Sequence, residues 1–151
     1  MTISLRKAKL SDAEFLFDLR NQADVYKYSR TNRPVKRKEH ISWLSSVLSE
    51  KEKKDLFIIQ QKSVPIGQVR FDRKQDGEAE ISIAVLKEFR GKGVGIKSFK
   101  EAVKLLKKEK KIKTIAAEVR KNNIVSQKFF ERLNFKLKRK KGKWLKYILK
   151  I

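Results

Sequence analysis

The segment RGKGVG, residues 90–95, has the composition of a phosphate-binding loop, with three glycines and two basic residues. Gly93 and Gly95 would let the backbone approach an anion closely, so that several N–H groups at a helix N-terminus could bind a pyrophosphate. Arg90 and Lys92 would add fixed positive charge. A plain glycine-rich turn before a helix is the simpler alternative.

Two common phosphate-binding signatures do not fit this loop. A Walker A loop requires G-x-x-x-x-G-K-[ST], and GKGVGIKS has Ile96 where the second glycine is needed. The dinucleotide-binding pattern G-x-G-x-x-G fails because Gly95 comes one residue early. A third pattern, [QR]-x-x-G-x-[GA] between an apolar strand and a helix, matches residues 90–95.

Hydrophobic periodicity predicts the elements that position this loop. Strands are expected over residues 3–10, 55–62, 64–72, 79–86 and 112–120, with a closing hairpin over 135–151. Helices are expected over residues 11–29, 36–52, 95–111 and 123–133, the first with a capping box formed by Ser11 and Glu14. The order β-α-α-β-β-β-α-β-α-β-β predicts one α+β domain over residues 1–151. A helix between parallel strands, with its N-terminus at the glycine loop, would place an anion site at the sheet edge.

Composition limits the function classes. The chain has 40 Lys+Arg against 17 Asp+Glu, a formal net charge of +23, which suggests an anionic partner but also suits a lysine-rich solvated surface. It has no cysteine, which excludes a disulfide scaffold, a thiolate metal site and a cysteine nucleophile, and we expect no metal. No apolar stretch approaches the ~20 residues of a membrane span, and the N-terminus lacks a signal-peptide core. We expect a cytoplasmic protein with no membrane partner.

Two segments resemble a known family. EISIAVLKEFRGKGVGIKSFKEAVKLL resembles the acetyl-CoA-binding segment of the GNAT superfamily of N-acetyltransferases. IAAEVRKNNIVSQKFFERLNF is similar to the family's next strand, its Asn-x-x-Ser helix start and its [YF]-E-[KR]-L-[GN]-F ending. The expected element order matches as well. The resemblance implies a GNAT fold with a mixed central sheet flanked by helices, acetyl-CoA as cofactor, and direct acetyl transfer to an amine in a ternary complex.

The resemblance also implies how the cofactor is held. The loop backbone would bind the pyrophosphate, and the splayed end of the preceding strand would bind the pantetheine arm, with help from Asn123 unless Asn122 or Asn123 is an ordinary helix cap. The implied cofactor-binding residues are Ile83, Ala84, Val85, Leu86, Arg90, Gly91, Lys92, Gly93, Val94, Gly95, Asn123 and Phe130.

Catalysis needs a base for the amine and stabilisation of the leaving thiolate. Glu80, where many family members place a carboxylate, and His40, the only histidine, are the two candidates for the base. Phe130 stands where the family commonly has a proton-donating tyrosine, and it has no proton to give. Ser126 or a water is the remaining candidate for the acid.

The acceptor site is expected in the N-terminal third. LRNQADVYKYSRTNRPVKRKEHISWL resembles a subgroup that includes the nucleotide-sugar N-acetyltransferases of pseudaminic acid biosynthesis (flagellin glycosylation), which acetylate the 4-amino group of a UDP-linked amino-dideoxy sugar. The expected substrate-binding residues are Arg20, Asn21, Tyr28, Ser29 and Trp43. Helix packing is an equally simple role for Trp43.

Two other functions stay open. Ribosomal-protein N-acetyltransferases share the fold and much of the N-terminal pattern, so a protein N-terminus is the alternative acceptor. Basic residues interleaved with aromatics in FKLKRKKGKWLKY would also suit a nucleic-acid-binding module without catalysis. We expect a small-molecule amine as the main partner, with nucleic acid a minor alternative, and a monomer or homodimer.

Overall fold

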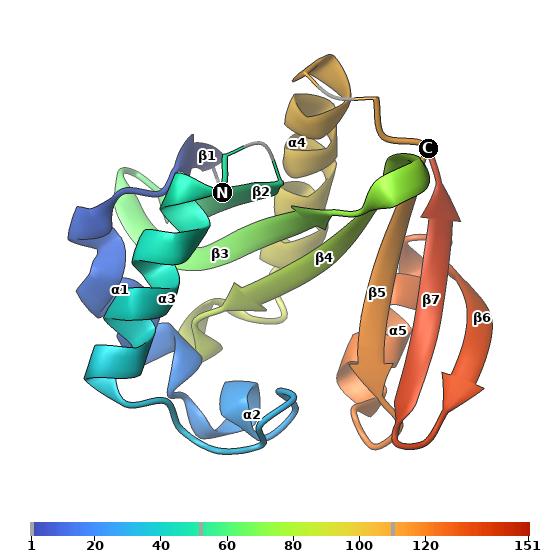
Figure 1. Ribbon diagram of the computed structural model, residues 1–151, viewed down its shortest axis with the longest axis horizontal. Helices are drawn as coiled ribbons and strands as arrows, with labels where there is room; N and C mark the ends of the chain where they lie inside the picture. Colours follow the sequence, from blue (N-terminus) through green and yellow to red (C-terminus); the bar gives the residue numbers. More distant parts are fainter. Residues whose placement is uncertain (1, 52, 110) are drawn as a thin grey trace.

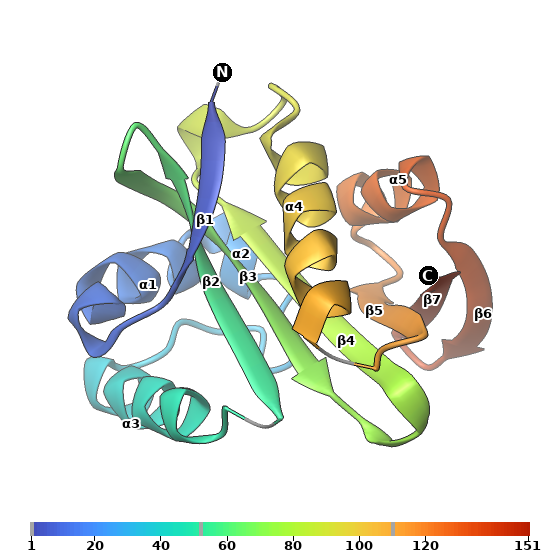
Figure 2. The ribbon, with the colours of Figure 1, turned by 90° about the horizontal axis from the view of Figure 1, so that it is seen from above.

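A seven-stranded mixed sheet runs through the molecule, and helices cover both of its faces (Figures 1 and 2). The computed structural model describes residues 2–51, 53–109 and 111–151. The strands are β1 (Ile3–Lys7), β2 (Lys54–Gln61), β3 (Val64–Arg73), β4 (Glu78–Val85), β5 (Thr114–Arg120), β6 (Lys136–Lys141) and β7 (Trp144–Lys150), in the order β1-β2-β3-β4-β5-β7-β6. The helices are α1 (Ala13–Arg20), α2 (Ala23–Tyr26), α3 (Arg37–Ser49), α4 (Val94–Glu109) and α5 (Ile124–Arg132).

The predicted α+β element order is therefore confirmed, with two differences near the N-terminus. The helix expected over 11–29 is broken into α1 and α2, because Gln22 is extended and Asn21 hydrogen-bonds to Val35 from the far side of the following loop. The Ser11–Glu14 capping box is wrong, since Glu14 pairs with Arg37 instead. Residue 52, at the end of the helix expected over 36–52, and residue 110, within that expected over 95–111, lie outside the described residues.

Two apolar clusters hold the layers together. The larger lies between the sheet and α4 and α5, and includes Phe71, Phe99 and Phe135. The smaller lies between the sheet and α1 and α3, around Leu44 and Ile58. Within the described ranges no helix is long and apolar enough to cross a membrane.

Strand alternation gives the sheet one apolar and one polar face. On β4, Ala79, Ile81 and Ile83 belong to the larger cluster, so Glu80 and Ser82 point to the other face, toward α1 and α3. On β3, Val69 and Phe71 likewise alternate with polar residues. The polar set on this face of β3 and β4 is Gln68, Arg70, Asp72, Glu78, Glu80 and Ser82. We call it the acceptor face below.

β4 and β5 are the only parallel neighbours among the described strands, and they pair only briefly. Their ladder joins Glu78 to Thr114 and ends where Glu80 meets Ala116. Beyond that point the strands diverge, as Figure 1 shows. The divergence opens the sheet beside the segment that leads into α4.

Candidate active site

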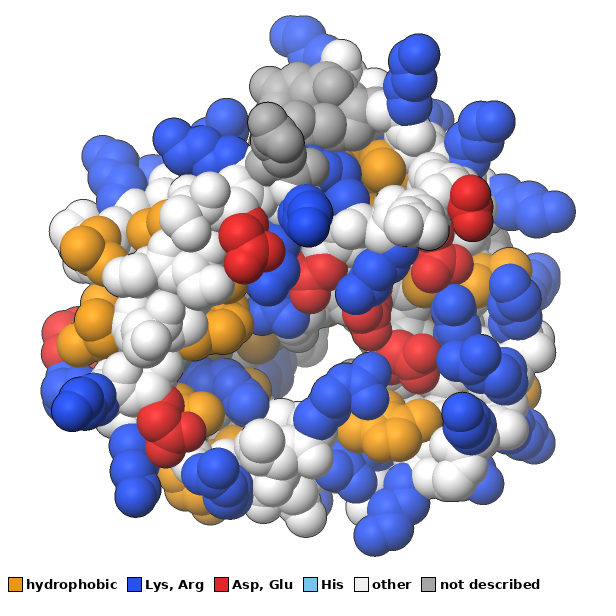
Figure 3. Space-filling model, viewed as in Figure 1, with side chains coloured by type: hydrophobic (Ala, Val, Ile, Leu, Met, Phe, Trp, Pro, Cys, Tyr) orange, Lys and Arg blue, Asp and Glu red, His pale blue; other side chains and the backbone are white. Residues whose placement is uncertain are grey.

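The edge of β4 beyond Glu80 has no strand partner toward β5 within the described chain. Its backbone groups from Ile81 to Val85 can therefore bind an extended ligand. The short turn Lys87–Phe89 and the glycine loop, residues 90–95, follow this edge directly and lead into α4. Figure 3 shows the same side of the molecule hollowed between α3 and β5, with acidic and basic side chains around the hollow.

The glycine loop presents backbone N–H groups at the start of α4. Gly91 and Gly93 have φ values of 75° and 78°, a left-handed conformation that side chains disfavour. Lys97 N–H is the donor that bonds back to Gly93, at 3.1 Å, so the N–H groups of Val94 to Ile96 have no partner inside the helix. Together with the helix dipole these groups favour an anion, and the loop fits the phosphates of a cofactor.

The side chains of Arg90 and Lys92 have other partners in this conformation. Arg90 pairs with Asp24 of α2, and its Nε donates to the Val85 carbonyl at 2.8 Å. The Arg90 guanidinium lowers the pKa of the Asp24 carboxyl. Lys92 folds back, and its Nζ donates to the Glu88 carbonyl at 3.2 Å. In this conformation Arg90 and Lys92 therefore shape the loop and contribute positive charge near the start of α4.

Gly95 is needed for helix packing. A Cβ at this position would lie 2.8 Å from Cε1 of Phe129 on α5. The φ of Gly95 is not positive, so a glycine is needed here because a side chain would collide with Phe129. At Gly91 and Gly93 a glycine is needed because φ is positive. The sequence pattern gave no sign of Phe129, which fixes the distance between α5 and the start of α4.

Asn123 caps α5. Its Oδ1 accepts from Ser126 N–H at 3.2 Å, and its Nδ2 donates to Ser126 Oγ at 3.0 Å. The helix-cap alternative is thus formed for Asn123, and the Ser126 hydroxyl is held at the first turn of α5 with its own proton free to be donated.

Phe130 lies in the core. It is 5% exposed, and its ring meets those of Phe129 and Phe135 in edge contacts with centroids 5.0 Å apart. It contributes an apolar wall near the start of α4 and no proton.

Glu80 lies where β4 and β5 separate, on the acceptor face. Its carboxylate is 3.8 Å from Arg30 and 3.7 Å from Lys74, and its side chain is 25% exposed. Asp72 is its cross-strand neighbour on β3. A carboxylate at this vertex, open to solvent and beside the free edge of β4, is placed to take a proton from a bound amine.

His40 lies in the helix layer instead. It is 4% exposed, and its ring contacts Phe17 edge-on and Trp43 at a tilt, with centroids 5.7 and 5.3 Å away. Its Nε2 has no partner among the described residues. Burial lowers the pKa of His40, and the charge of Arg20 lowers it further. Both effects favour the neutral imidazole.

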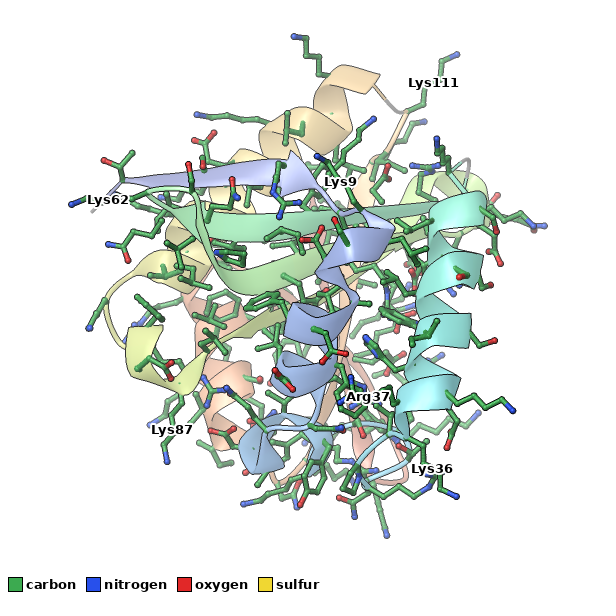
Figure 4. The ribbon with its side chains drawn as sticks, turned by 90° about the vertical axis from the view of Figure 1, so that its left-hand side faces the viewer. Lys9, Lys36, Arg37, Lys62, Lys87 and Lys111 are labelled. Atoms are coloured by element: carbon green, nitrogen blue, oxygen red, sulfur yellow. The ribbon has the colours of Figure 1, made fainter. Side chains whose placement is uncertain are left out.

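Arg20 and Trp43 face the same region as His40. Arg20 ends α1 and is half-buried, and burial and the nearby charge of Arg70 lower its pKa. Trp43 lies under the Arg70 guanidinium, 5.4 Å from the ring centroid. Figure 4 shows the layer of α1 and α3 in front of the sheet, with Arg37 between the two helices.

Asn21 and Ser29 maintain the loop between α2 and α3. The Asn21 amide exchanges two hydrogen bonds with Val35, of 3.0 and 2.8 Å. Ser29 Oγ donates to the Tyr26 carbonyl at 2.8 Å, and Tyr28 packs under Lys27. Asn21 and Ser29 thus position the loop that borders the acceptor face, and the substrate contact expected of them stays a prediction.

The far end of this loop is tied to β5 and β7. Arg120 donates from Nε and Nη2 to the Ser29 carbonyl, at 3.1 and 2.8 Å. The Trp144 ring lies between two guanidiniums, those of Arg30 and Arg120, each 4.8 Å from its centroid. The loop therefore closes the acceptor face on the side of the separated strands.

Sequence reasoning missed four residues of this region: Gln68, Arg70, Arg120 and Trp144. One signal was available for two of them. Gln68, Arg70 and Asp72 alternate with apolar residues in a strand that has a neighbour on each side. A polar row in a central strand indicates a face that binds something other than a second core layer.

Comparison with known proteins identifies the domain type. The model of a family described as "Acetyltransferase (GNAT) domain" matches residues 2–136. No curated protein sequence matches the chain significantly.

Solved structures share the whole fold. A domain from Methanocaldococcus jannaschii DSM 2661 is 27% identical with a TM-score of 0.85, and the match covers 99% of both chains. RimL, a ribosomal L7/L12 alpha-N-protein acetyltransferase in complex with coenzyme A, is 17% identical with a TM-score of 0.87 over 100% of this chain and 95% of its own. FdhC, a nucleotide-linked sugar GNAT, is 21% identical with a TM-score of 0.82 over 99% and 86%.

Proposed function

Because the chain belongs to the GNAT family of acetyltransferases, we propose that it transfers an acetyl group from acetyl-CoA to the 4-amino group of a UDP-linked amino-dideoxy sugar. The observation that carries acetyl transfer is the position of Glu80. Its carboxylate lies where β4 leaves β5, between the acceptor face and the free edge that leads into the glycine loop. The sugar acceptor is supported by the RN…S…EH-x-x-W pattern of residues 20–43, and FdhC, a nucleotide-linked sugar GNAT, is similar in fold.

The cofactor would be held mainly by backbone. The N–H groups around the start of α4 suit the pyrophosphate, and the unpaired edge from Ile81 to Val85 suits the amide-bearing pantetheine arm. Acetyl-CoA supplies an activated acyl group on a thiolate leaving group. Because Arg90 joins Val85 to Asp24, it fixes the angle between the edge and the loop.

Glu80 would act as the general base. An amine arriving on the acceptor face must lose a proton before or during attack, and Glu80 can accept it directly or through a water. Lys74 and Arg30 orient the carboxylate from two sides. His40 is less suited to this role, because its only free nitrogen is buried between helices α1 and α3.

Ser126 would assist departure of the thiolate. The Asn123 amide holds its hydroxyl at the first turn of α5, where the hydroxyl proton can be donated. Phe130 excludes water from the same neighbourhood without taking part in proton transfer. Since a thiolate is a good leaving group, we expect Ser126 to contribute modestly.

A protein N-terminus is the second acceptor class. RimL, which acts on a ribosomal protein, has a similar fold, and a net charge of +23 would attract an acidic partner and repel a basic one.

Binding of nucleic acid without catalysis is less well supported. All six residues of β6 are exposed and five are basic, but lysines on an edge strand also prevent sheet-to-sheet association.

Thiol release from acetyl-CoA tests the proposal directly. We expect acetyl-CoA to raise the melting temperature, and a UDP-linked 4-amino sugar to give faster thiol release than a peptide with a free N-terminus. A saturating concentration of acetyl-CoA that gives no thermal shift would refute the enzyme assignment. If the peptide is acetylated faster than the sugar, the acceptor is a protein N-terminus and the sugar proposal is wrong.

A further inference from the structure

Arg70 on the acceptor face and Arg20 at the end of α1 lie near each other, and of the two only Arg70 is paired with a carboxylate among the described residues. Arg70 Nε donates to Asp72 Oδ1 at 3.0 Å. Arg20 is half-buried and forms no hydrogen bond or ion pair within residues 2–51, 53–109 and 111–151. Arg70 lies close enough for its charge to act on Arg20. One positive charge is therefore unbalanced at a site where burial makes an unpaired ion costly.

Polar atoms without partners surround these arginines. His40 Nε2 and Gln68 Oε1 are buried and have no hydrogen-bond partner in the part of the chain that the structure describes. Gln68 lies two residues before Arg70 and shares its face of β3. Trp43 connects the groups, because its ring stacks on His40 with centroids 5.3 Å apart and also lies under Arg70. Buried polar groups are normally hydrogen-bonded, so a ligand or water is expected here.

We propose that Arg20, His40, Trp43, Gln68 and Arg70 form a subsite for an oxyanion of the acceptor, a phosphate or a carboxylate group. The oxyanion would pair with Arg20 and share Arg70 with Asp72, while Gln68 and His40 would accept hydrogen bonds from hydroxyl or N–H groups beside it. The inference rests on the proposed acetyl transfer and narrows its substrate to amines that carry negative charge. Polyamines and other polycations are disfavoured, since Arg20 and Arg70 would repel them.

The first test measures binding to protein that is already saturated with coenzyme A, so that the glycine loop is filled. UDP and the acidic tripeptide Ser-Glu-Glu serve as phosphate and carboxylate probes in calorimetric titrations. We expect Arg20→Gln to weaken the better probe about tenfold to a hundredfold, and Arg20→Lys to weaken it less. Arg37→Gln is the matched control, because Arg37 is an exposed helix arginine paired with Glu14 and should leave binding unchanged.

The outcomes separate the two hypotheses. Failure to bind coenzyme A refutes the proposed function. If the protein binds coenzyme A but neither probe, the oxyanion subsite alone is refuted. The same holds if Arg20→Gln binds the better probe with the affinity of the wild type. The stronger probe identifies a phosphate or a carboxylate as the group recognised.

His40 gives a second test that needs no substitution. It is the only histidine, so its Cε1–H resonance in untagged protein can be followed through a pH titration. The charged groups that act on it are Arg20 and Glu14, both from α1, and the positive charge of Arg20 lowers its pKa. An anion beside Arg20 should offset that charge and move the His40 midpoint to higher pH when the better-bound of the two probes is added to the coenzyme A complex. An unmoved midpoint at a saturating concentration of that probe would overturn the subsite.

Discussion

Arg90 in the glycine loop is paired with Asp24 in α2, 66 residues earlier in the chain. The same guanidinium donates to the Gln22 side chain at 3.1 Å and to the Val85 carbonyl at 2.8 Å. The glycine loop, which suits the cofactor phosphates, is thus joined to α2 and the residue before it, on the side where the acceptor is expected. Cofactor and acceptor segments therefore cannot move independently while Arg90 keeps its partners.

Arg90→Lys should impair cofactor binding more than stability. A lysine cannot hold three acceptors in the fork geometry that arginine uses, so the loop should sample other conformations. We expect the KM for acetyl-CoA to rise about threefold to tenfold, with a loss of unfolding free energy of at most about 1 kcal/mol, since the ion pair is partly exposed. Steady-state kinetics and urea unfolding measure both quantities. Arg132→Lys on the exposed side of α5 is the control, and an unchanged KM in Arg90→Lys would contradict the role given to Arg90.

Gly93→Ala and Gly95→Ala should destabilise the protein for different reasons. Gly93 has positive φ with open space around it, so alanine is strained whatever its neighbours. At Gly95 the added Cβ would meet the Phe129 ring at 2.8 Å. We expect each change to cost about 1–2 kcal/mol of unfolding free energy.

A double-mutant cycle with Phe129→Ala distinguishes these two causes. Removing the ring should eliminate most of the cost of Gly95→Ala, and even leave a gain from the helix propensity of alanine. The cost of Gly93→Ala should stay the same in both backgrounds. Equal costs for Gly95→Ala with and without the Phe129 ring would rule out the packing explanation.

The glycine loop illustrates how much of the site was predictable. The role of Gly93 and the start of α4 depend on local conformation, so the sequence pattern predicted them, whereas the positive φ of Gly91 was not predicted. The partners that explain Gly95 and Arg90 come from elements distant in the chain, and no local pattern names Phe129 or Asp24. The fold was predictable for the same reason that the loop was, because alternation and helical periodicity are local.

The acceptor side was harder to predict because its order comes from long-range hydrogen bonds. The helix expected over residues 11–29 breaks after α1, where Asn21 binds Val35 of the next loop. That contact gives Asn21 a role in supporting the loop that its local sequence did not indicate. Only three-dimensional packing shows that Arg20, one residue earlier, has no anionic partner among the residues that the structure describes.

Glu80→Gln should remove most of the turnover. Glutamine has the same shape but cannot accept the proton of the amine, so we expect kcat to fall about a hundredfold with the KM for acetyl-CoA nearly unchanged. Glu78→Gln is the matched control, because Glu78 lies on the same face of β4 and pairs with Lys146 at 3.3 Å. Wild-type turnover in Glu80→Gln would exclude Glu80 as the base, and a parallel assay of His40→Gln would then test the other candidate.

Asp12 makes a pH-dependent contribution to stability. Its carboxylate is 8% exposed, accepts from Arg6 at 2.7 and 2.8 Å and from Lys9 N–H at 2.8 Å, and the hydrogen bond from Arg6 holds its pKa below the usual value. A depressed pKa in the folded state stabilises the fold above the ordinary carboxyl pKa of about 3.9, and this stabilisation is lost as the pH falls through the folded value.

Asp12→Asn should therefore cost about 1–3 kcal/mol of unfolding free energy at pH 7, and progressively less below about pH 4. Urea unfolding of wild type and variant at both pH values measures the difference. Glu14→Gln, which removes an exposed pair with Arg37, should change stability by less than about 0.5 kcal/mol at either pH. A cost for Asp12→Asn that is independent of pH would indicate lost packing instead of a lost ion pair.

Trp144 should control the loop between α2 and α3. Its ring lies between the guanidiniums of Arg30 and Arg120, and Arg120 also holds the Ser29 carbonyl. Trp144→Leu keeps an apolar residue at the start of β7 but removes the aromatic ring. Each of the two cation–π contacts that are lost contributes about 0.5–1 kcal/mol. The loop should then open more often, which would expose the bond after Arg30 to trypsin and raise the KM for the acceptor without raising that for acetyl-CoA. Trp144→Phe should retain most of the wild-type resistance to trypsin, because it keeps an aromatic face. Equal cleavage rates in Trp144→Leu and Trp144→Phe would show that the Arg120 hydrogen bonds alone hold the loop.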